Sequence, residues 1–584
     1  MVVPSPGWKL IPGPEYPWYS YISPGTRMRP EFASLRDRPD VSVLIIGGGI
    51  NGIGLFYELA LQGVDALLVE KSDFCAGTSA AMTRVIHGGL RYLENAEFRL
   101  VRESLRERNR LLKNAPHYVK PLPTTIPIFS WASGIFPAIR NLLGWPAKPG
   151  DRGALLIKTG LALYDFLAGR RSTLPRHRFR SRREALALRP ALNPEVICTA
   201  TYYDAKITYP ERLCLELVLD AEAACPGAHA LNYVRLESAA GGTVVLRDEV
   251  SGETREVRPR IVVNAAGPWI DAVNRGLGRA SRFIGGTKGS HIVLDHPKLV
   301  EAAGDEMIYF ANRDGRICIF YAVDGRIVAG ATDIPADDPE AVCDEAEVDY
   351  ILDAMRLAFP SIHVDRSHVV FRFCGVRPLP RSDAPTPGQI SRDHSFPALP
   401  AGDGIDFPIY SLVGGKWTTF RALAEQVADE ILPVLGRPRI RSSADLAIGG
   451  GKGYPRMPQS AGLSQERLAA LEERYGTGAE KVAAYLEAGA DAPLANHPAY
   501  SRREIEFMAL HERVVHLDDL VLRRTLMGLL GQVNRPLLEE LAAIVSPALG
   551  WSPAGAARDV ERTVQLLERV HGVMAEALSK SSLR

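Results

Sequence analysis

The pattern of apolar and polar residues predicts a strand, a helix and a second strand between residues 41 and 73. Residues 41–46 form an apolar run rich in β-branched side chains, which is typical of a buried parallel strand. An amphipathic segment follows, and Gly63 stands where that helix would end. A second apolar run, VDALLV, ends at Glu70. This order of elements indicates a parallel α/β unit.

Three glycines separate the first strand from the helix with the spacing G-x-G-x-x-G. Gly47 would allow the tight turn, Gly49 would let the backbone approach a pyrophosphate, and Gly52 would let helix and strand pack closely. The helix N-terminus offers free N–H groups and a positive partial charge. Glu70 follows eighteen residues after Gly52 and can accept both ribose hydroxyls of an adenosine. The context predicts a dinucleotide site, but this loop alone does not separate NAD from FAD.

Three later segments favour FAD. Residues 260–273 predict a buried strand that ends in small residues, as a strand end pressed against a ligand would, and residues 326–333 are similar. Residues 410–432 predict a strand, a glycine pair and a helix N-terminus, which suits a negatively charged reduced ring. A cofactor contacted by all these segments is deeply enclosed, as a tightly held flavin would be. The cofactor positions expected here are Gly267, Asp333, Gly415 and Thr418.

Composition and charge argue against several classes of protein. The 584 residues carry a formal net charge of +1, so no global field favours nucleic acid. The seven cysteines contain no CxxC pair, no cluster has metal-ligand spacing, and a reducing, cytoplasmic compartment fits. Residues 1–39 carry too many prolines for a signal peptide, and they predict an extended arm that is either a docking segment or a disordered leader.

Longer stretches resemble a known family. The segments IIGGGINGIG and VEKSDFCAGTSAAMTRVIHGGLRYLENAEFRLVRESLRER are similar to those of the FAD-dependent glycerol-3-phosphate dehydrogenases. Residues 287–294, 374–379 and 414–425 resemble further motifs of that family, and residues 503–528 resemble its C-terminal helical domain. The resemblance covers roughly residues 40–580. It implies oxidation of sn-glycerol 3-phosphate to dihydroxyacetone phosphate by hydride transfer to FAD, with electrons passed to quinone.

The resemblance also implies roles for the run HGGLRYLE, which begins at His87. Residues 74–92 would pass along the flavin, and the two glycines would let the backbone lie against its ring. The residues implied at the cofactor are Thr78, Ser79, Gly88 and Gly89. Those implied at the substrate are Arg91 and Tyr92. The alternative is a glycine turn that only caps the following helix and leaves Arg91 in solvent.

Three further side chains are candidates for the reaction itself. Oxidation of a secondary alcohol removes a hydride from carbon and a proton from the hydroxyl. Arg377 is the candidate for the phosphate and the reacting oxygen, because arginine offers paired donors. Lys416 stands at a helix N-terminus, where a cation is unfavourable unless an anion is bound. His291 is the expected proton acceptor, because an unperturbed imidazole titrates near neutrality. The structural alternatives are an ion pair, a surface lysine and a core histidine.

The chain departs from the family pattern at four places. These are Cys374, Ala331, the pair Phe320-Tyr321 and the run Met82-Thr83-Arg84. No departure removes a cofactor element, but together they leave open a larger polyol phosphate, such as erythritol phosphate. Two other classes also stay open. One is a flavin oxidase that passes electrons to oxygen, and the other is a nucleotide-binding protein of RNA modification, which the absence of a basic stripe argues against.

The predicted fold class is α/β. It comprises a doubly wound, Rossmann-type FAD domain, an α+β substrate domain and an all-helical C-terminal domain. The FAD domain is expected at residues 40–118, 196–275 and 370–435, and the substrate domain at 119–195 and 276–369. A glycine-rich linker precedes the helical domain, expected at 447–584. The oligomeric state stays open, with a homo-oligomer among the alternatives.

A membrane contact is expected because an enzyme that reduces quinone must touch the bilayer. Residues 121–139 are uncharged and apolar, but their four prolines exclude a continuous spanning helix. Trp145 follows, beside Lys and Arg, which is typical of an interfacial anchor. Residues 121–167 are therefore expected either to contact anionic lipid peripherally, on the inner face of the cell membrane, or to be a buried part of the substrate domain.

Overall fold

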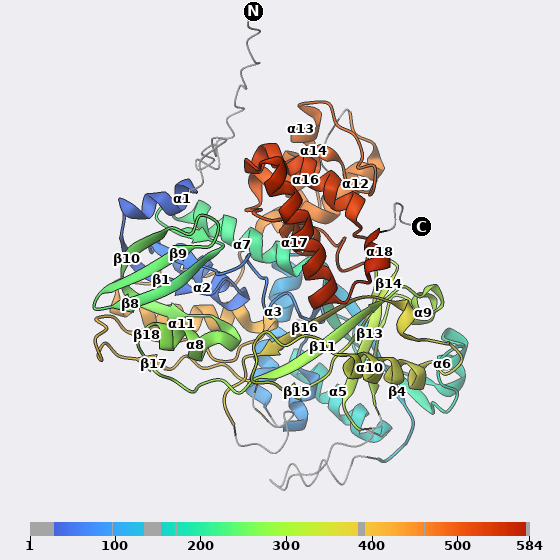
Figure 1. The fold of residues 1–584 in the computed structure, drawn as a ribbon. Coiled ribbons are helices and arrows are strands. Elements are labelled where there is room, and N and C mark those ends of the chain that lie inside the picture. Colours follow the sequence, from blue (N-terminus) through green and yellow to red (C-terminus); the bar gives the residue numbers. More distant parts are fainter. Residues whose placement is uncertain are drawn as a thin grey trace, which may run out of the picture.

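The structure is a computed structural model in which two sheets lie side by side and a group of helices covers one end of both (Figure 1). It describes residues 29–95, 97–133, 153–169, 173–312, 314–382, 390, 392–456, 458, 460 and 462–579. Of the extended arm expected at residues 1–39, residues 1–28 lie outside the described residues. The expectation is wrong for Pro30–Arg36, which form helical turns with Phe32 and Leu35 buried.

The first sheet is the α/β unit that the sequence predicts. Its strands run in the order β17, β18, β10, β1, β2 and β7, and β1 pairs in parallel with β10 and β2. Helices α2, α7 and α11 pack together on one face. The opposite face is covered by α1, α8 and the β8–β9 hairpin, which extends β10. The bounds are β1 Asp40–Ile46, β2 Ala66–Val69, β7 His229–Leu231, β8 Val234–Ala240, β9 Thr243–Asp248, β10 Thr254–Asn264, β17 Ala398–Leu399, β18 Ile409–Ser411, α1 Pro30–Ala33, α2 Ile50–Ala60, α7 Pro210–Ala224, α8 Ile270–Gly276 and α11 Phe420–Val434.

The second sheet is mostly antiparallel. Its strands run in the order β15, β11, β14, β13, β12, β4, β6 and β3, with β16 on β11 and β5 on β6. Helices α9 and α10 cover one face, where Ile292 and Leu294 of β11 pack in a hydrophobic core. The bounds are β3 Val85–Ile86, β4 Val119–Ile128, β5 Arg178–Ser181, β6 Cys198–Ile207, β11 Thr287–Leu294, β12 Met307–Ala311, β13 Ile317–Val323, β14 Arg326–Gly330, β15 Ile334–Pro335, β16 Val369–Arg377, α3 Phe98–Asn114, α5 Ala154–Ala168, α6 Arg182–Leu188, α9 Pro297–Ala303 and α10 Glu345–Ala358.

Three strands within the ranges expected for the FAD domain belong to the second sheet instead. Strand β3 pairs with β6, β6 pairs with β4 along its whole length, and β16 pairs with β11. An apolar strand is compatible with either sheet, so periodicity does not decide its partner. The chain therefore crosses between the sheets more often than the expected ranges imply, and these crossings bring the candidate site residues together.

The C-terminal region is helical, as the sequence predicts. Its helices are α12 Gln465–Tyr475, α13 Ala479–Glu487, α14 Arg502–His511, α15 Leu517–Asp519, α16 Arg535–Leu549, α17 Pro553–His571 and α18 Ala575–Ser579, and a π-helical turn, η9, spans Leu520–Arg524. The Ser501 hydroxyl caps α14 by accepting from the Glu504 N–H, and Ser552 caps α17 ahead of Pro553.

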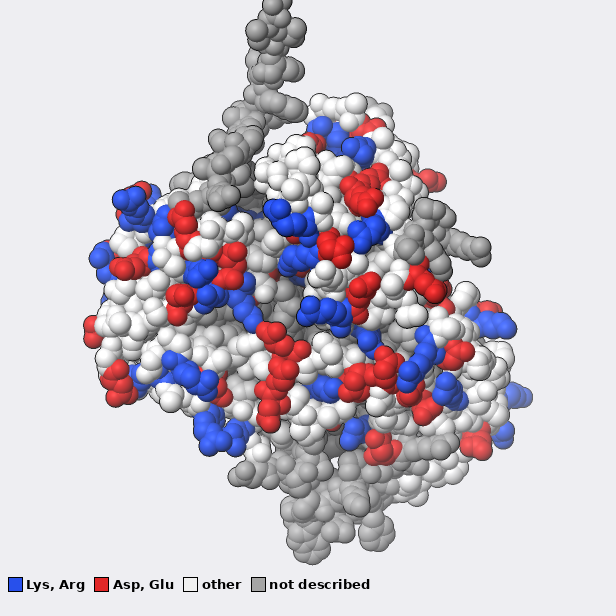
Figure 2. Space-filling model, viewed as in Figure 1, with Lys and Arg blue, Asp and Glu red and all other residues white. Residues whose placement is uncertain are grey.

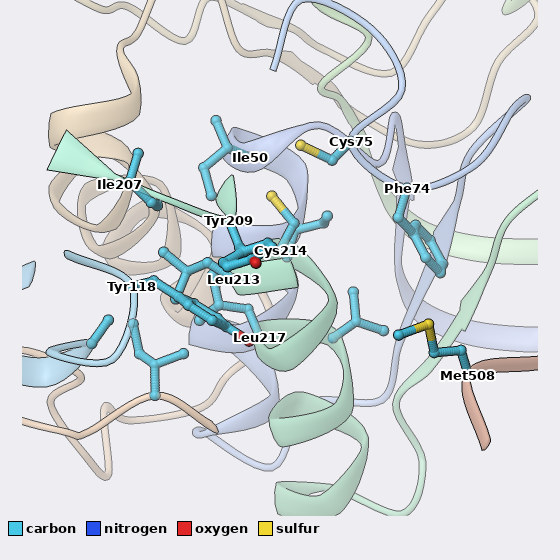
Figure 3. Close-up of a cluster of buried hydrophobic side chains, with 14 of the residues drawn as sticks. Ile50, Phe74, Cys75, Tyr118, Ile207, Tyr209, Leu213, Cys214, Leu217 and Met508 are labelled. Atoms are coloured by element: carbon cyan, nitrogen blue, oxygen red, sulfur yellow. The ribbon is translucent and has the colours of Figure 1, made fainter. Parts of the chain in front are cut away.

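A hydrophobic core continues from the start of α2 into the C-terminal helices (Figure 3). Ile50 opens α2, and Leu213 and Leu217 lie on α7 behind it. Met508 of α14 is fully buried in the same core. The helical region is therefore packed against the α/β unit by apolar contacts.

The surface carries charges of both signs. Figure 2 shows Lys and Arg interspersed with Asp and Glu over one face, with no broad basic field. No helix within the described residues has both the length and the apolarity to cross a membrane. Among the described residues, no three His, Cys, Asp or Glu side chains lie close enough together to hold a metal ion.

Candidate active site

The dinucleotide loop joins β1 to α2 and needs glycine for two different reasons. Gly47 has φ +116°, and a Cβ there would lie 2.6 Å from the Ala265 carbonyl carbon. A Cβ at Gly52 would lie 2.0 Å from the Gly47 oxygen. At Gly49, the N-cap of α2, the nearest atom to such a Cβ is the Ser79 hydroxyl oxygen at 3.1 Å. Protein packing thus requires glycine at 47 and 52, whereas at 49 the one close neighbour of a Cβ among the described residues is a hydroxyl oxygen, so the constraint from the protein is weaker.

Glu70 holds this loop from the end of β2. Its carboxylate accepts the Gly48 N–H at 2.7 Å and the Ser72 N–H at 2.9 Å. Burial raises the pKa of Glu70, and the two backbone N–H groups oppose that rise. The acid expected at the ribose therefore also fixes the loop that would bind the pyrophosphate.

Residues 75–84 tie the dinucleotide loop to the second sheet. The Thr78 hydroxyl donates to the Val376 carbonyl of β16 at 2.7 Å. The Ser79 hydroxyl accepts the Ile50 N–H at 3.0 Å, and its carbonyl accepts from the indole of Trp417 at 2.9 Å. Thr78 and Ser79 consequently stand where β16, α2 and the second glycine turn meet.

The second glycine turn lies against the first. Gly414 and Gly415 have φ +77° and +86°, and a Cβ at Gly415 would lie 2.6 Å from the Asn51 amide nitrogen. A 3₁₀ turn, η6 Trp417–Thr419, then leads into α11, and Thr418 is buried in it. The buried Asn51 Oδ1 and Thr419 Oγ1 have no hydrogen-bond partner among the described residues. Such atoms cost about 1–3 kcal/mol each when unsatisfied, so these loops fit a polar cofactor that approaches them.

Gly267 stands at the carboxyl end of β10, as expected. It opens a 3₁₀ turn, η3 Gly267–Trp269, with φ +58°, and a Cβ there would meet no atom within 4 Å. A side chain at position 267 would therefore point into space that no described atom occupies.

Protein contacts account for both glycines of the HGGLRYLE run. A Cβ at Gly88 would lie 1.9 Å from the Tyr164 hydroxyl, and the Gly88 N–H donates to Asp204 at 2.8 Å. Gly89 has φ +88°, and a Cβ there would lie 2.7 Å from the ring of Tyr92. The turn leads into η2 Leu90–Asn95, which contains Arg91, but the side chain of Arg91 lies outside the described part. A flavin contact for these glycines stays a prediction.

Arg377 ends β16 and lies over β11. A Cβ at Gly289 would lie 2.1 Å from Arg377 Nη2, so the guanidinium covers that glycine. Asp333 accepts from Arg377 Nη1 at 3.1 Å and from Arg392 Nη2 at 3.1 Å. The role expected for Asp333 was at the cofactor, whereas the structure places its carboxylate between two arginines. The carboxylate of Asp333 therefore helps to hold the Arg377 guanidinium over β11.

His291 lies on the same face of β11 as Gly289, because alternate residues of a strand share a face. Its ring stacks on Phe373 at 4.8 Å with an interplanar angle of 5°, and its Nε2 is 2.8 Å from the Thr83 hydroxyl. Its buried Nδ1 has no hydrogen-bond partner within the described residues. Burial, with the positive charge of Arg377, lowers the pKa of His291 to about 3. The imidazole is therefore neutral at physiological pH, and its low pKa makes it a weak proton acceptor that does not titrate near neutrality as expected.

Lys416 is held beside Tyr92. Its ammonium nitrogen lies 3.7 Å from the centre of the Tyr92 ring, is buried, and has no hydrogen-bond partner in the described part of the chain. Burial lowers the pKa of Lys416 to about 7, although Glu97, Glu103 and Asp393 oppose this shift. A buried cation without a hydrogen bond fits a bound anion better than it fits the surface alternative.

The comparisons with known proteins agree with this geometry. Residues 42–455 match the family described as FAD dependent oxidoreductase. The chain belongs to that family. Residues 411–556 of this flavoenzyme also match the C-terminal domain of alpha-glycerophosphate oxidase.

The flavoenzyme is similar along most of its length to curated relatives. A glycerol-3-phosphate dehydrogenase from Synechocystis is 32% identical over 92% of this chain and 98% of the relative. One from Pseudomonas tolaasii is 32% identical over 87% of this chain and 95% of the relative. A solved glycerol-3-phosphate dehydrogenase from Bacillus halodurans, complexed with FAD, matches with a TM-score of 0.69. It is 24% identical and covers 92% of this chain and 96% of its own, so it shows the fold alone.

Sequence reasoning missed three residues of the flavoenzyme's site. Thr83 was noted only as a departure, yet its hydroxyl meets His291 and its carbonyl accepts from the Tyr321 hydroxyl at 3.0 Å. Arg392 was not considered, although it shares Asp333 with Arg377. Asp73 lies on the loop that follows β2, and it pairs with Arg523 and Arg524. No local pattern marks these residues, because their partners are distant in the sequence.

Proposed function

We propose that this FAD-dependent oxidoreductase oxidises sn-glycerol 3-phosphate to dihydroxyacetone phosphate. The observation that carries the proposal is that the Arg377 guanidinium, which covers Gly289, and the His291 imidazole lie over the same face of β11. The guanidinium offers paired donors for a phosphate, and the neutral imidazole offers a site for a proton. The names of the curated relatives support this substrate.

An alcohol oxidation needs groups that bind the substrate, polarise its oxygen and accept its proton, and different side chains would fill these roles. Bound FAD would accept the hydride from the carbinol carbon. Arg377, held by Asp333, would bind the anionic head and polarise the reacting oxygen. Lys416 would add a second cation, and His291 would take the hydroxyl proton. The alcohol then loses one hydride and one proton, which leaves the ketone.

A larger polyol phosphate, such as erythritol phosphate, is the second candidate substrate. The observation that favours it is the position of Thr83 and Tyr321, which both depart from the family pattern. Thr83 contacts His291, and Tyr321 donates to the Thr83 carbonyl. Changes beside the proton acceptor are expected to alter the space around the substrate chain, while the phosphate site at Arg377 stays the same.

We also propose quinone as the electron acceptor and a peripheral membrane contact. For residues 121–128 the structure supports the buried alternative, because they form β4 with Leu122, Ile126 and Ile128 in the core. Beyond β4, three apolar side chains are exposed: Trp131 by 68%, Leu155 by 59% and Phe166 by 76%. Phe136 and Trp145 lie outside the described residues. The contact is therefore proposed for the exposed side of α5 and Trp131.

Anaerobic reduction of the purified flavoenzyme tests the proposal. The flavin absorption should bleach on addition of sn-glycerol 3-phosphate, and the rate should be compared with erythritol phosphate at equal concentration. Faster bleaching by the tetritol would select the second candidate, and no bleaching by either would reject both. The reduced enzyme is then re-oxidised either by a soluble quinone or by air. Rapid re-oxidation by the quinone indicates a dehydrogenase, and a high yield of hydrogen peroxide in air indicates an oxidase.

A further inference from the structure

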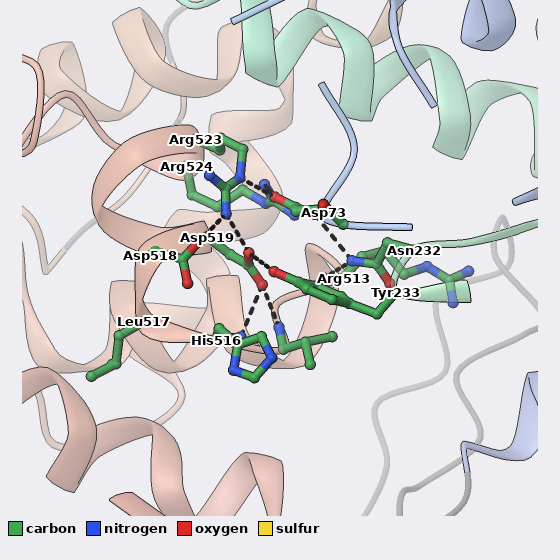
Figure 4. Close-up of polar contacts among 12 residues, drawn as sticks. Asp73, Asn232, Tyr233, Arg513, His516, Leu517, Asp518, Asp519, Arg523 and Arg524 are labelled. Carbon is green, nitrogen blue, oxygen red and sulfur yellow. Dashed lines mark hydrogen bonds and ion pairs between the residues drawn. The ribbon is translucent and has the colours of Figure 1, made fainter. Parts of the chain in front are cut away.

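A buried ion network joins the C-terminal helices to the loop that follows β2 (Figure 4). At its centre is Asp73, which is fully buried. Its carboxylate accepts from Arg523 Nε at 2.6 Å, from Arg524 at 2.7 and 3.0 Å, and from Asn232 at 3.0 Å. Four donors satisfy a carboxylate that would be very costly to bury alone.

Positive and negative side chains alternate through the network. Arg523 also donates to Asp518 at 2.7 Å and to Asp519 at 2.6 Å, and Arg562 pairs with Asp518. The three arginines thus meet three aspartates, namely Arg523, Arg524, Arg562, Asp73, Asp518 and Asp519. Burial would raise the pKa of Asp73, but the neighbouring guanidinium groups hold it below its ordinary value. Asp73 is therefore ionised, and the arginines of η9 hold it in place.

Asp73 lies within the segment that holds the dinucleotide loop. Three residues before it, Glu70 accepts the Gly48 N–H at 2.7 Å. Two residues after it, the Cys75 N–H donates to the Gly48 carbonyl at 2.8 Å. Both polar backbone groups of Gly48, at the middle of the G-x-G turn, are thus held by residues that flank Asp73. A displacement of Asp73 would shift the loop expected to carry the pyrophosphate.

We propose that Asp73 is a positioning residue through which the C-terminal helical region sets how tightly FAD is retained. The helices fix Asp73, Asp73 fixes residues 70–75, and those residues fix Gly48. The proposal needs only FAD binding and does not depend on which alcohol is oxidised. Among the described residues, the C-terminal region contributes no side chain to the candidate active site. Its part in cofactor binding is exerted through Asp73.

The test compares two buried pairs that join the same regions. Asp73→Asn removes the charge at the centre of the network. Glu512→Gln is the control, because the Glu512 carboxylate pairs with Arg212 of α7 at 2.8 and 2.9 Å. Only the backbone carbonyl of Glu512, which the substitution keeps, accepts from Arg524. The rate of FAD release from each holoenzyme is followed by the rise of free-flavin fluorescence after dilution. The melting temperature of each apoprotein is measured beside it.

Asp73→Asn is expected to release FAD about tenfold faster or more, since one lost charged hydrogen bond corresponds to a factor of this size. Glu512→Gln is expected to lower the melting temperature similarly while FAD release stays within about twofold of the parent rate. Equal acceleration in both variants, or an unchanged rate in Asp73→Asn, would overturn the proposal.

A conservative variant keeps the test decisive if Asp73→Asn does not fold. Arg524→Lys retains the positive charge but loses the paired contact with Asp73. It should release FAD at least about threefold faster than the parent, with the absorption spectrum of the bound flavin shifted. A parent-like rate and spectrum in this variant would also overturn the proposal.

Discussion

At the scale of single residues, burial changes what the candidate side chains can do. His291 is the clearest case, because burial and the charge of Arg377 keep it neutral across the physiological pH range. Its pKa is about 3, so a change of the reaction rate with pH near 6.5 would come from another group. Its proton-accepting role then depends on geometry, which Thr83 and Phe373 hold.

Replacement of Arg377 tests the substrate anchor. Arg377→Lys keeps a positive charge near Asp333 but loses the paired donors, so kcat/KM should fall about 100-fold or more, which corresponds to roughly 3 kcal/mol. The FAD content should match the parent, because Arg377 is not expected to bind the cofactor. Parent-like rates with both sn-glycerol 3-phosphate and erythritol phosphate would show that the assignment is wrong.

The lowered pKa of Lys416 predicts that substrate binding depends on pH. Its pKa is lowered to about 7, so its ammonium is progressively lost as the pH rises through 7. If it holds the phosphate, KM should rise about tenfold per pH unit well above 7, since one proton is required. Lys416→Met should have a high KM that does not change between pH 7 and 9.

A second lysine provides the control for this pH dependence. Lys288→Met should retain the dependence on pH, because Lys288 pairs with Asp344 and Glu347 instead. A parent enzyme with constant KM over this range would remove Lys416 from the substrate site.

At the scale of elements, the glycine turns show which contacts belong to the protein and which to a ligand. Gly49→Val should abolish FAD uptake. It should leave the apoprotein folded, because a Cβ there crowds only the Ser79 hydroxyl, at 3.1 Å, and a small shift of that side chain relieves the contact. Gly52→Ala should destabilise the apoprotein itself, because its Cβ would meet the Gly47 oxygen at 2.0 Å. Circular dichroism of the apoproteins and flavin absorbance after reconstitution distinguish the two. Yellow Gly49→Val protein would contradict the prediction.

At the scale of the whole molecule, the exposed apolar side chains around α5 predict where a membrane would touch. The inner face of α5 buries Leu161 and Tyr164, so substitutions on its outer face should leave the core intact. A variant with Trp131, Leu155 and Phe166 changed to Ser should co-sediment less with anionic liposomes and keep the parent flavin spectrum. Ile440→Ser, which is 72% exposed elsewhere, should behave as the parent. Equal sedimentation of all three proteins would contradict the contact.

Much of the cofactor region was predictable because its signals are local. The strand, the glycine spacing and Glu70 lie within thirty residues of chain, and each follows from backbone sterics or from helix-end chemistry. The second glycine turn at 414 and 415 was predictable for the same reason. Roles for Arg377, Lys416 and His291 stay predictions, although the structure brings Arg377 and His291 to one sheet face.

What the sequence by itself determined is the set of local elements, the FAD-binding family and the helical C-terminal region. The tertiary structure decided which sheet receives β6 and β16, why Asp333 lies between two arginines, and how Asp73 reaches Arg523 and Arg524. These contacts join residues separated by tens to hundreds of positions. Strand pairing and burial of charge depend on the completed core, so a short window of sequence does not contain them.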